Sequence, residues 1–170
     1  MTVYRIYTYP EKILKRKAKE VKNITGALQQ FIDNMYETMH VASGVGLAAT
    51  QVGQDNAVFV ADVPAENDQR RIIAVINPVI IESEGQSSIE EGCLSVPNFR
   101  IPVKRSARIV IKGYDRDGKD IILEATDLLA TVIQHEMDHL NGVTLLDHAS
   151  LLKRGAYLRS LKKESQSAKG

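Results

Sequence analysis

The segment from Thr126 to Gly142 constrains the fold most, because it is predicted to be a helix with apolar side chains on every side. Thr126 or Asp127 can cap its start, and Asn141 followed by Gly142 can end it. Its apolar residues are Leu128, Leu129, Val132, Ile133, Met137 and Leu140. A helix that is apolar all round belongs in the interior of a protein, so we expect strands to pack about it.

The same helix carries the sequence QHEMDH, in which His135 and His139 lie one helical turn apart. Side chains at i and i+4 project from one face, so the two imidazoles can bind the same metal ion. Glu136 lies beside that face. This pattern is typical of hydrolases in which a divalent metal lowers the pKa of water and a carboxylate carries the proton. The alternative is a helix with two surface histidines and a glutamate in a salt bridge.

Cys93 is the only cysteine and follows a glycine in the sequence EGCLS. A catalytic metal needs a third protein ligand, and beside the histidine pair a thiolate is our preferred candidate. A lone cysteine can also be a small buried hydrophobe. One cysteine cannot form an internal disulfide, which suits a reducing compartment.

A third motif, GVGLAATQ, begins with Gly44 and Gly46. Glycines and the small residues after them leave room for a group to lie against the main chain. The motif lacks the lysine of a phosphate-binding loop and the third glycine of a dinucleotide fold. A tight connection leaving a helix is the alternative interpretation.

Together the three motifs resemble the peptide deformylases, which remove the formyl group from the N-terminal methionine of new bacterial and organellar proteins. The motifs stand in that family's order and at about its separations, and the resemblance spans nearly the whole chain. It implies metal ligands at Cys93, His135 and His139, an acid/base at Glu136, and oxyanion donors at the Gln51 side chain and the Leu94 backbone N–H. It also implies that Arg105 pairs with Glu91, although Lys104 stands where some relatives have a proline.

The methionine side chain needs an apolar, adaptable pocket, which four residues are expected to line: Val45, Ile89, Leu128 and Val132. Downstream residues of the peptide can pair in extended form with the backbone of Val45 and Gly46. A His-His-Cys ligand set accepts zinc, iron, nickel or cobalt. The resemblance favours one ferrous ion per chain.

The remaining pattern predicts an α+β fold, with antiparallel sheets around the central metal-binding helix and a C-terminal helix. We expect one domain over residues 1–170, with a frayed tail from about 165. A helix is predicted from about residue 25 to 41, and short strands at 57–61 and 72–76, the second stopped by Asn77-Pro78. Strands at 108–114 and 120–125 flank the hairpin signal Asp115-Arg116-Asp117-Gly118.

The chain's charges nearly balance, with 22 Lys and Arg against 21 Asp and Glu, so we expect no sequence-specific nucleic-acid partner. We also expect no membrane partner, since no apolar run approaches spanning length. The start of the chain lacks a signal-peptide pattern, which favours a bacterial-type cytoplasm, with a processed organellar form as the open alternative. The basic helix from Leu151 to Lys163 is either a solvated face or, through the resemblance, a contact for ribosomal RNA.

Two other functions remain open. A zinc-dependent endopeptidase or aminopeptidase shares the HExxH pattern, but it would normally add a histidine or glutamate ligand in place of the cysteine. A structural metal site would need a fourth protein ligand, and no second cysteine exists to supply it. His40 and His148 are interpreted as ordinary histidines outside the site.

Overall fold

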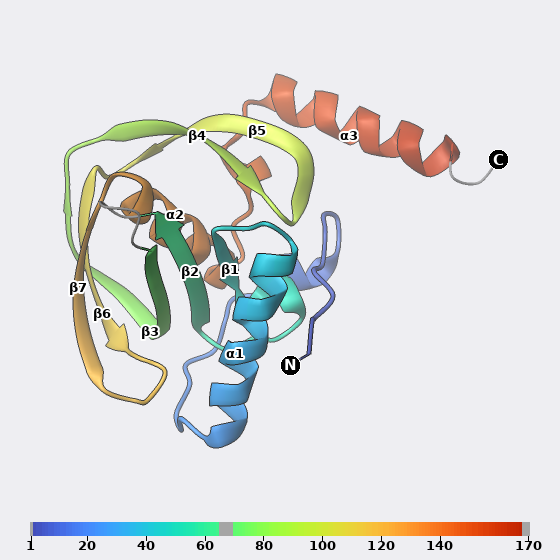
Figure 1. Ribbon diagram of the computed structural model, residues 1–170. Coiled ribbons are helices and arrows are strands. Elements are labelled where there is room, and N and C mark those ends of the chain that lie inside the picture. Colours follow the sequence, from blue (N-terminus) through green and yellow to red (C-terminus); the bar gives the residue numbers. More distant parts are fainter. Residues whose placement is uncertain (1, 65–69, 168–170) are drawn as a thin grey trace.

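A five-stranded antiparallel sheet with a helix on each face forms the body of the computed structural model (Figure 1). The structure describes residues 2–64 and 70–167. In spatial order the five strands are β1 (Gly46–Ala48), β2 (Val58–Pro64), β3 (Arg70–Glu84), β6 (Arg108–Tyr114) and β7 (Asp120–Thr126). A separate hairpin pairs β4 (Ser87–Cys93) with β5 (Val96–Arg105). The helices are α1 (Gly26–Val41), α2 (Asp127–Leu140) and α3 (Leu151–Ser167), with 3-10 turns η1 (Lys12–Lys15), η2 (Ala49–Val52) and η4 (Leu145–His148). The α+β prediction is confirmed.

Strand β2 shows why both faces of the sheet are covered. Its side chains alternate between the faces, so that Phe59 and Ala61 pack in the cluster around α2 while Val58 and Val60 pack against α1. All four are fully buried. Such a strand has no solvent face, and its nearly continuous apolar sequence follows from that position.

Helix α2 lies in the interior, as its all-round apolar surface predicts, and it contacts β1, β2, β5, β6 and β7 (Figure 1). Leu129, Val132 and Ile133 are buried, whereas Leu128 is partly exposed at the helix start. Thr126 is the N-cap, as one of the two predicted alternatives, but its side chain makes no capping hydrogen bond, and Asp127, the other alternative, is the first residue of the helix. Asn141 and Gly142 end the helix, with Gly142 at a φ of 73°.

The predicted end of a strand at Asn77-Pro78 is wrong. Strand β3 continues to Glu84, with a register shift between Ile76 and Val79. Asn77 takes a φ of 52°, which asparagine tolerates, and its side-chain amide bonds both the N–H and the carbonyl of Val21. The irregularity divides β3 into a first half paired with β2 and a second half paired with β6.

Helix α1 and the hairpin of β6 and β7 confirm the sequence-based predictions for residues 25–41 and 108–125. Thr25 caps α1, its hydroxyl accepting the N–H of Leu28. The turn between β6 and β7 is closed by the Asp115 carboxylate, which accepts the N–H groups of Asp117 and Lys119.

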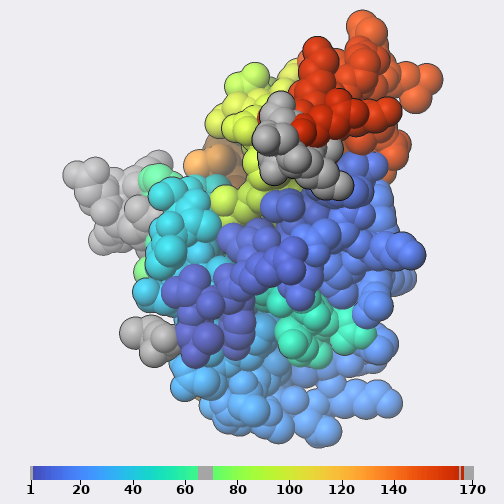
Figure 2. Space-filling model, turned by 90° about the vertical axis from the view of Figure 1, so that its right-hand side faces the viewer, coloured from blue at the N-terminus to red at the C-terminus, as the bar shows by residue number. Residues whose placement is uncertain are grey.

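The C-terminal helix α3 stands out from the body of the molecule (Figures 1 and 2). Its buried contact is Tyr157, which packs with Phe99 at a ring-centroid distance of 5.0 Å. The helix reaches Ser167, further than predicted, and residues 168–170 of the expected frayed tail lie outside the described residues. No helix in the described part of the chain is both long and apolar enough to cross a membrane.

Candidate metal centre

Helix α2 and the end of strand β4 bring Cys93, His135 and His139 together. Their ligand atoms all lie within 4.8 Å of one another, and Cys93 Sγ is 3.1 Å from His139 Nε2. Because α2 is buried on both sides, its histidines are held beside the hairpin rather than in solvent. One sulfur and two imidazole nitrogens at this spacing fit a four-coordinate divalent metal with one position left for water or substrate.

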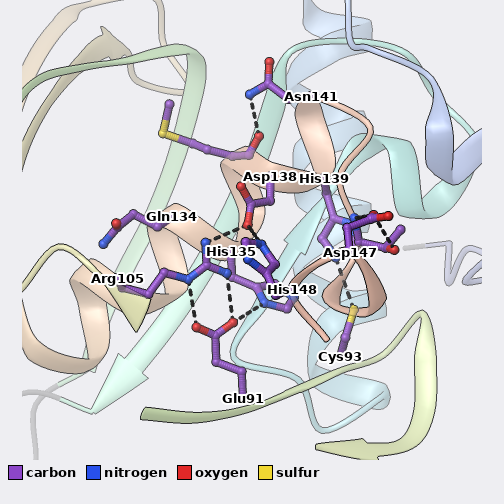
Figure 3. Close-up of polar contacts among 12 residues, drawn as sticks. Glu91, Cys93, Arg105, Gln134, His135, Asp138, His139, Asn141, Asp147 and His148 are labelled. Carbon is purple, nitrogen blue, oxygen red and sulfur yellow. Dashed lines mark hydrogen bonds and ion pairs between the residues drawn. The ribbon is translucent and has the colours of Figure 1, made fainter. Parts of the chain in front are cut away.

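A chain of polar contacts orients His135 (Figure 3). Its Nδ1 lies 2.8 Å from Glu91 Oε2, and since a carboxylate only accepts, Nδ1 carries the proton and Nε2 is left to bind a metal. Arg105 donates to both oxygens of Glu91, at 2.8 and 2.9 Å. Both Glu91 and Arg105 are buried, so the sequence-predicted pair is present as a bidentate contact behind the histidine.

The two histidines differ in their electrostatic surroundings. Burial alone would lower the pKa of His135, but its hydrogen bonds to Cys93 and Glu91 outweigh burial and raise it well above the ordinary value. Burial, together with repulsion from His135, lowers the pKa of His139. The lowered pKa of His139 favours the neutral imidazole that a metal requires, and in both histidines the nitrogen that binds the metal must be free of its proton.

Glu136 lies fully inside the site. Burial raises the pKa of its carboxyl to about 7, with the nearby charge of His135 opposing the rise. Its Oε2 is buried and makes no hydrogen bond within the described residues. A buried carboxylate with a free oxygen and a pKa near neutrality is suited to take up and return a proton.

The two glycines of GVGLAATQ are explained by the close approach of neighbouring side chains. A Cβ at Gly46 would lie 2.3 Å from Glu136 Oε1, and a Cβ at Gly44 would lie 2.7 Å from Leu94 Cδ1. Gly46 starts strand β1, so the alternative of a simple connection after α1 describes only the residues before it. The motif therefore lets the main chain of β1 touch the acid/base candidate directly.

Gln51, on the turn η2, lies against the centre. Its Oε1 accepts the backbone N–H of Ala48 at 2.8 Å, which fixes the direction of the amide. Its Nε2 donates to Ser95 Oγ at 3.1 Å and faces Cys93 Sγ at 3.8 Å. The adjacent Thr50 hydroxyl donates to the carbonyl of His139, tying η2 to α2.

A cavity of about 540 Å³ opens over these residues. Every residue predicted to bind substrate lines it: Val45, Gly46, Ile89, Leu128 and Val132. Gln51, Cys93, Leu94, His135 and Glu136 line it as well. Phe99 and Arg100 of β5 and Thr131 of α2 also line it, and the sequence motifs did not single them out.

Sequence reasoning also missed Asp138 and His148. Arg105 Nη1 donates to Asp138 Oδ2 at 2.6 Å, and the same oxygen lies 2.8 Å from His148 Nε2 (Figure 3). His148 lies outside the group of candidate ligands, as predicted, but it contacts Asp138 and so joins the residues behind His135. Asp138 stands inside QHEMDH, but nothing in the sequence indicates its partners.

Comparisons with known proteins agree with this geometry. Residues 3–155 match the family model of polypeptide deformylase. The chain belongs to the polypeptide deformylase family. It is 47% identical over 162 residues to a peptide deformylase of Thermodesulfovibrio yellowstonii, covering 95% of this chain and 98% of that protein.

Solved deformylase structures show the same fold. A peptide deformylase from Legionella pneumophila superposes with a TM-score of 0.89 at 37% identity, covering 98% of both chains. One from Ehrlichia chaffeensis, in complex with actinonin, gives 0.91 at 36% identity over 96% of this chain and 98% of that one. The deformylase family is metal-dependent, and the Cys/His/His group is present here. The matches do not support the endopeptidase or aminopeptidase alternative.

Proposed function

We propose that this protein hydrolyses the N-formyl group from the N-terminal formylmethionine of newly made polypeptides and releases formate. The observation that carries the proposal is the convergence of Cys93, His135 and His139 beside the buried carboxylate of Glu136, in a chain of the deformylase family. The cavity over these residues supplies the space for a peptide end.

Cys93, His135 and His139 would hold the divalent ion. When bound, that ion lowers the pKa of water and polarises the formyl oxygen. Glu136 takes the proton lost as water attacks the formyl carbon, and its free Oε2 and raised pKa support that role. Glu136 then returns the proton to the methionine nitrogen, so that the C–N bond breaks and formate leaves.

The developing negative charge on the formyl oxygen needs donors. The Leu94 backbone N–H and the Gln51 amide are our candidates, and the amide direction set by Ala48 supports Gln51. Each such donor contributes roughly 2.7 to 4 kcal/mol to the transition state. A neutral glutamine suits this role, because it donates without adding charge that would retain formate.

The rest of the cavity is expected to select the peptide end. Val45, Ile89, Leu128 and Val132 would surround an unbranched methionine side chain, which their apolar character supports. Strand β1 is an edge of the five-stranded sheet, so the backbone of Val45 and Gly46 can pair with downstream residues in extended form. That pairing would give affinity without reading the downstream sequence.

Acyl selectivity tests this function. The Leu94 backbone N–H and the Gln51 amide would crowd the formyl group and leave little room for a methyl group, so N-formyl peptides should be substrates and N-acetyl peptides of identical sequence should not. Formate or acetate release from matched peptides measures the difference. Equal rates on both peptides would contradict the proposed site.

We infer ferrous iron as the physiological metal, with Zn²⁺, Ni²⁺ and Co²⁺ as the other ions that a His-His-Cys set accepts. The family resemblance supports iron, and the thiolate and two imidazoles suit all four ions. Metal analysis of protein purified without oxygen, with activity measured in parallel, tests the choice. Zinc at full occupancy with full activity would show that iron is wrong.

We also propose that the enzyme works in a bacterial-type cytoplasm.

We further propose that α3 contacts the ribosome. Support comes from the basic side chains of α3, which include exposed Lys153 and Arg159, and from its position away from the body (Figure 2). Charge reversal by Lys153→Glu with Arg159→Glu should reduce co-sedimentation with ribosomes and leave hydrolysis of short formyl peptides intact. Unchanged co-sedimentation would refute the contact.

A further inference from the structure

His148 ends an unbroken line of polar contacts that starts at His135. The line runs from His135 through Glu91, Arg105 and Asp138 to His148, and its links measure between 2.6 and 2.9 Å (Figure 3). It joins the turn η4, which leads into α3, to a residue that would bind the metal. We propose that His148 is a positioning residue for the metal centre, acting through Asp138 on the orientation of His135. The inference rests on the metal site proposed above.

Asp138 is the residue in this line whose carboxylate needs a second hydrogen-bond donor to keep its orientation. Its Oδ2 accepts from both Arg105 Nη1 and His148 Nε2, and since a carboxylate only accepts, His148 carries its proton on Nε2. The Asp138 side chain is 28% exposed, so with a single donor it can turn toward water. Two donors that approach one oxygen from different elements hold the carboxylate against that rotation.

The contact between Arg105 and Glu91 is buried, so the alignment of these two side chains affects His135. The side chains of Arg105 and Glu91 are 6% and 5% exposed, so water cannot replace a contact that either one loses. Arg105 uses Nε and Nη2 on Glu91 and Nη1 on Asp138, which fixes the guanidinium plane from two sides. That plane sets where Glu91 Oε2 meets His135 Nδ1, and hence the ring orientation that a metal would meet.

His148 itself is anchored. It is the last residue of η4, whose Leu145 and Leu146 are buried in a cluster with Val96 and other residues of β5. Asp147 caps the same turn by accepting the N–H and hydroxyl of Thr144. The backbone of η4 is therefore held against β5 by Leu145 and Leu146, so His148 can fix a residue of α2 relative to the hairpin that carries Glu91.

The test compares three variants in cobalt-loaded protein. His148→Phe keeps a ring but removes the donor, whereas His148→Gln places an amide N–H near the position of Nε2. His40→Phe is the matched control, because His40 Nε2 also lies 2.8 Å from a carboxylate, that of Asp62, away from this line of contacts. The readouts are the visible absorption of bound Co²⁺, the metal dissociation constant, and kcat and KM on a formyl peptide.

Loss of a hydrogen-bonding partner of a metal ligand typically weakens metal binding 10- to 100-fold, and His148 lies further out, so about a threefold to tenfold weakening is expected. His148→Phe should shift the cobalt spectrum and lower kcat by a similar factor, with KM unchanged. His148→Gln should restore the wild-type values, and His40→Phe should keep them.

A wild-type cobalt spectrum and metal affinity in His148→Phe would overturn the proposal. Failure of His148→Gln to restore them, or an equal change in His40→Phe, would overturn it as well, since either result would indicate a general loss of stability. Formate release by the cobalt-loaded wild type is measured separately. A wild type that releases no formate would contradict the proposed function, whereas the comparison of the variants tests the role of His148.

Discussion

Replacement of Gly46 by alanine should disable the acid/base residue without touching a metal ligand. The added Cβ would lie 2.3 Å from Glu136 Oε1 and 2.9 Å from Val132 Cγ1. Real Cβ atoms essentially never approach another heavy atom within 3.0 Å, so the Glu136 carboxylate or strand β1 must move by at least about 0.7 Å. Strand β1 is held by its pairing with β2, so the displacement falls on the Glu136 carboxylate, whose free Oε2 faces the cavity.

The size of the effect follows from that displacement. A misplacement of about 1 Å in a catalytic group can cost on the order of 100-fold in rate, so kcat of Gly46→Ala should fall by roughly that factor. Metal content should stay near that of the wild type, because Cys93, His135 and His139 are not the groups pushed aside. Steady-state formate release and metal analysis on the same preparation give both quantities.

Two other glycines provide graded controls. At Gly44 the added Cβ meets the end of the flexible Leu94 side chain at 2.7 Å, so Gly44→Ala should cost much less activity than Gly46→Ala. At Gly26, in the first turn of α1, the added Cβ meets nothing within 4 Å, so Gly26→Ala should leave activity unchanged. Wild-type kcat in Gly46→Ala, or an equal loss in all three variants, would refute the steric argument.

Three further changes probe the site and its support. Glu136→Gln keeps size but removes the proton carrier, so turnover should fall by roughly 100-fold or more with metal retained; near-normal turnover at full metal content would refute the acid/base role. Cys93→Ala should purify largely metal-free and inactive with the fold intact. Cys93→Asp should recover part of the metal with low activity. Stoichiometric metal and wild-type deformylation in Cys93→Ala would show that the third ligand lies elsewhere. Asp147→Ala removes the cap on η4 and should lower the free energy of unfolding by about 1 kcal/mol at pH 7. Burial alone would raise the pKa of Asp147, but bonds from Lys15 and Thr144 lower it, so this stability is present above the ordinary carboxyl pKa and lost as pH falls through the lowered value. Urea unfolding should show the difference at pH 7 and not in strong acid; an equal difference at both would contradict the linkage.

Local patterns predicted the elements that bear the chemistry. The all-round apolar surface of α2 required an interior position, and the spacing of His135 and His139 required a shared face, because both follow from helix geometry alone. The hairpin at Asp115 was predicted for the same kind of reason, since its turn residues determine a local backbone shape.

The contacts that could not be predicted from the sequence depend on tertiary structure. Asn77-Pro78 has the composition of a strand end, yet long-range bonds between Asn77 and Val21 stabilise a bend within one strand. The link from His148 to Asp138 requires η4 to fold back beside α2, and no local spacing indicates that. Gly46 was predicted to lie close to a partner, but the partner, Glu136, became identifiable only once β1 and α2 were seen in contact.

Deformylation is tested best by the fate of one N-formylmethionyl tripeptide incubated with the metal-loaded protein. Mass spectrometry of the peptide and an independent assay of formate would be made on the same reaction. We predict one equivalent of formate and an intact, deformylated tripeptide, with both products falling together in Glu136→Gln. Cleavage of a bond between amino-acid residues, or an unchanged formyl peptide in the presence of stoichiometric metal, would contradict the proposed function.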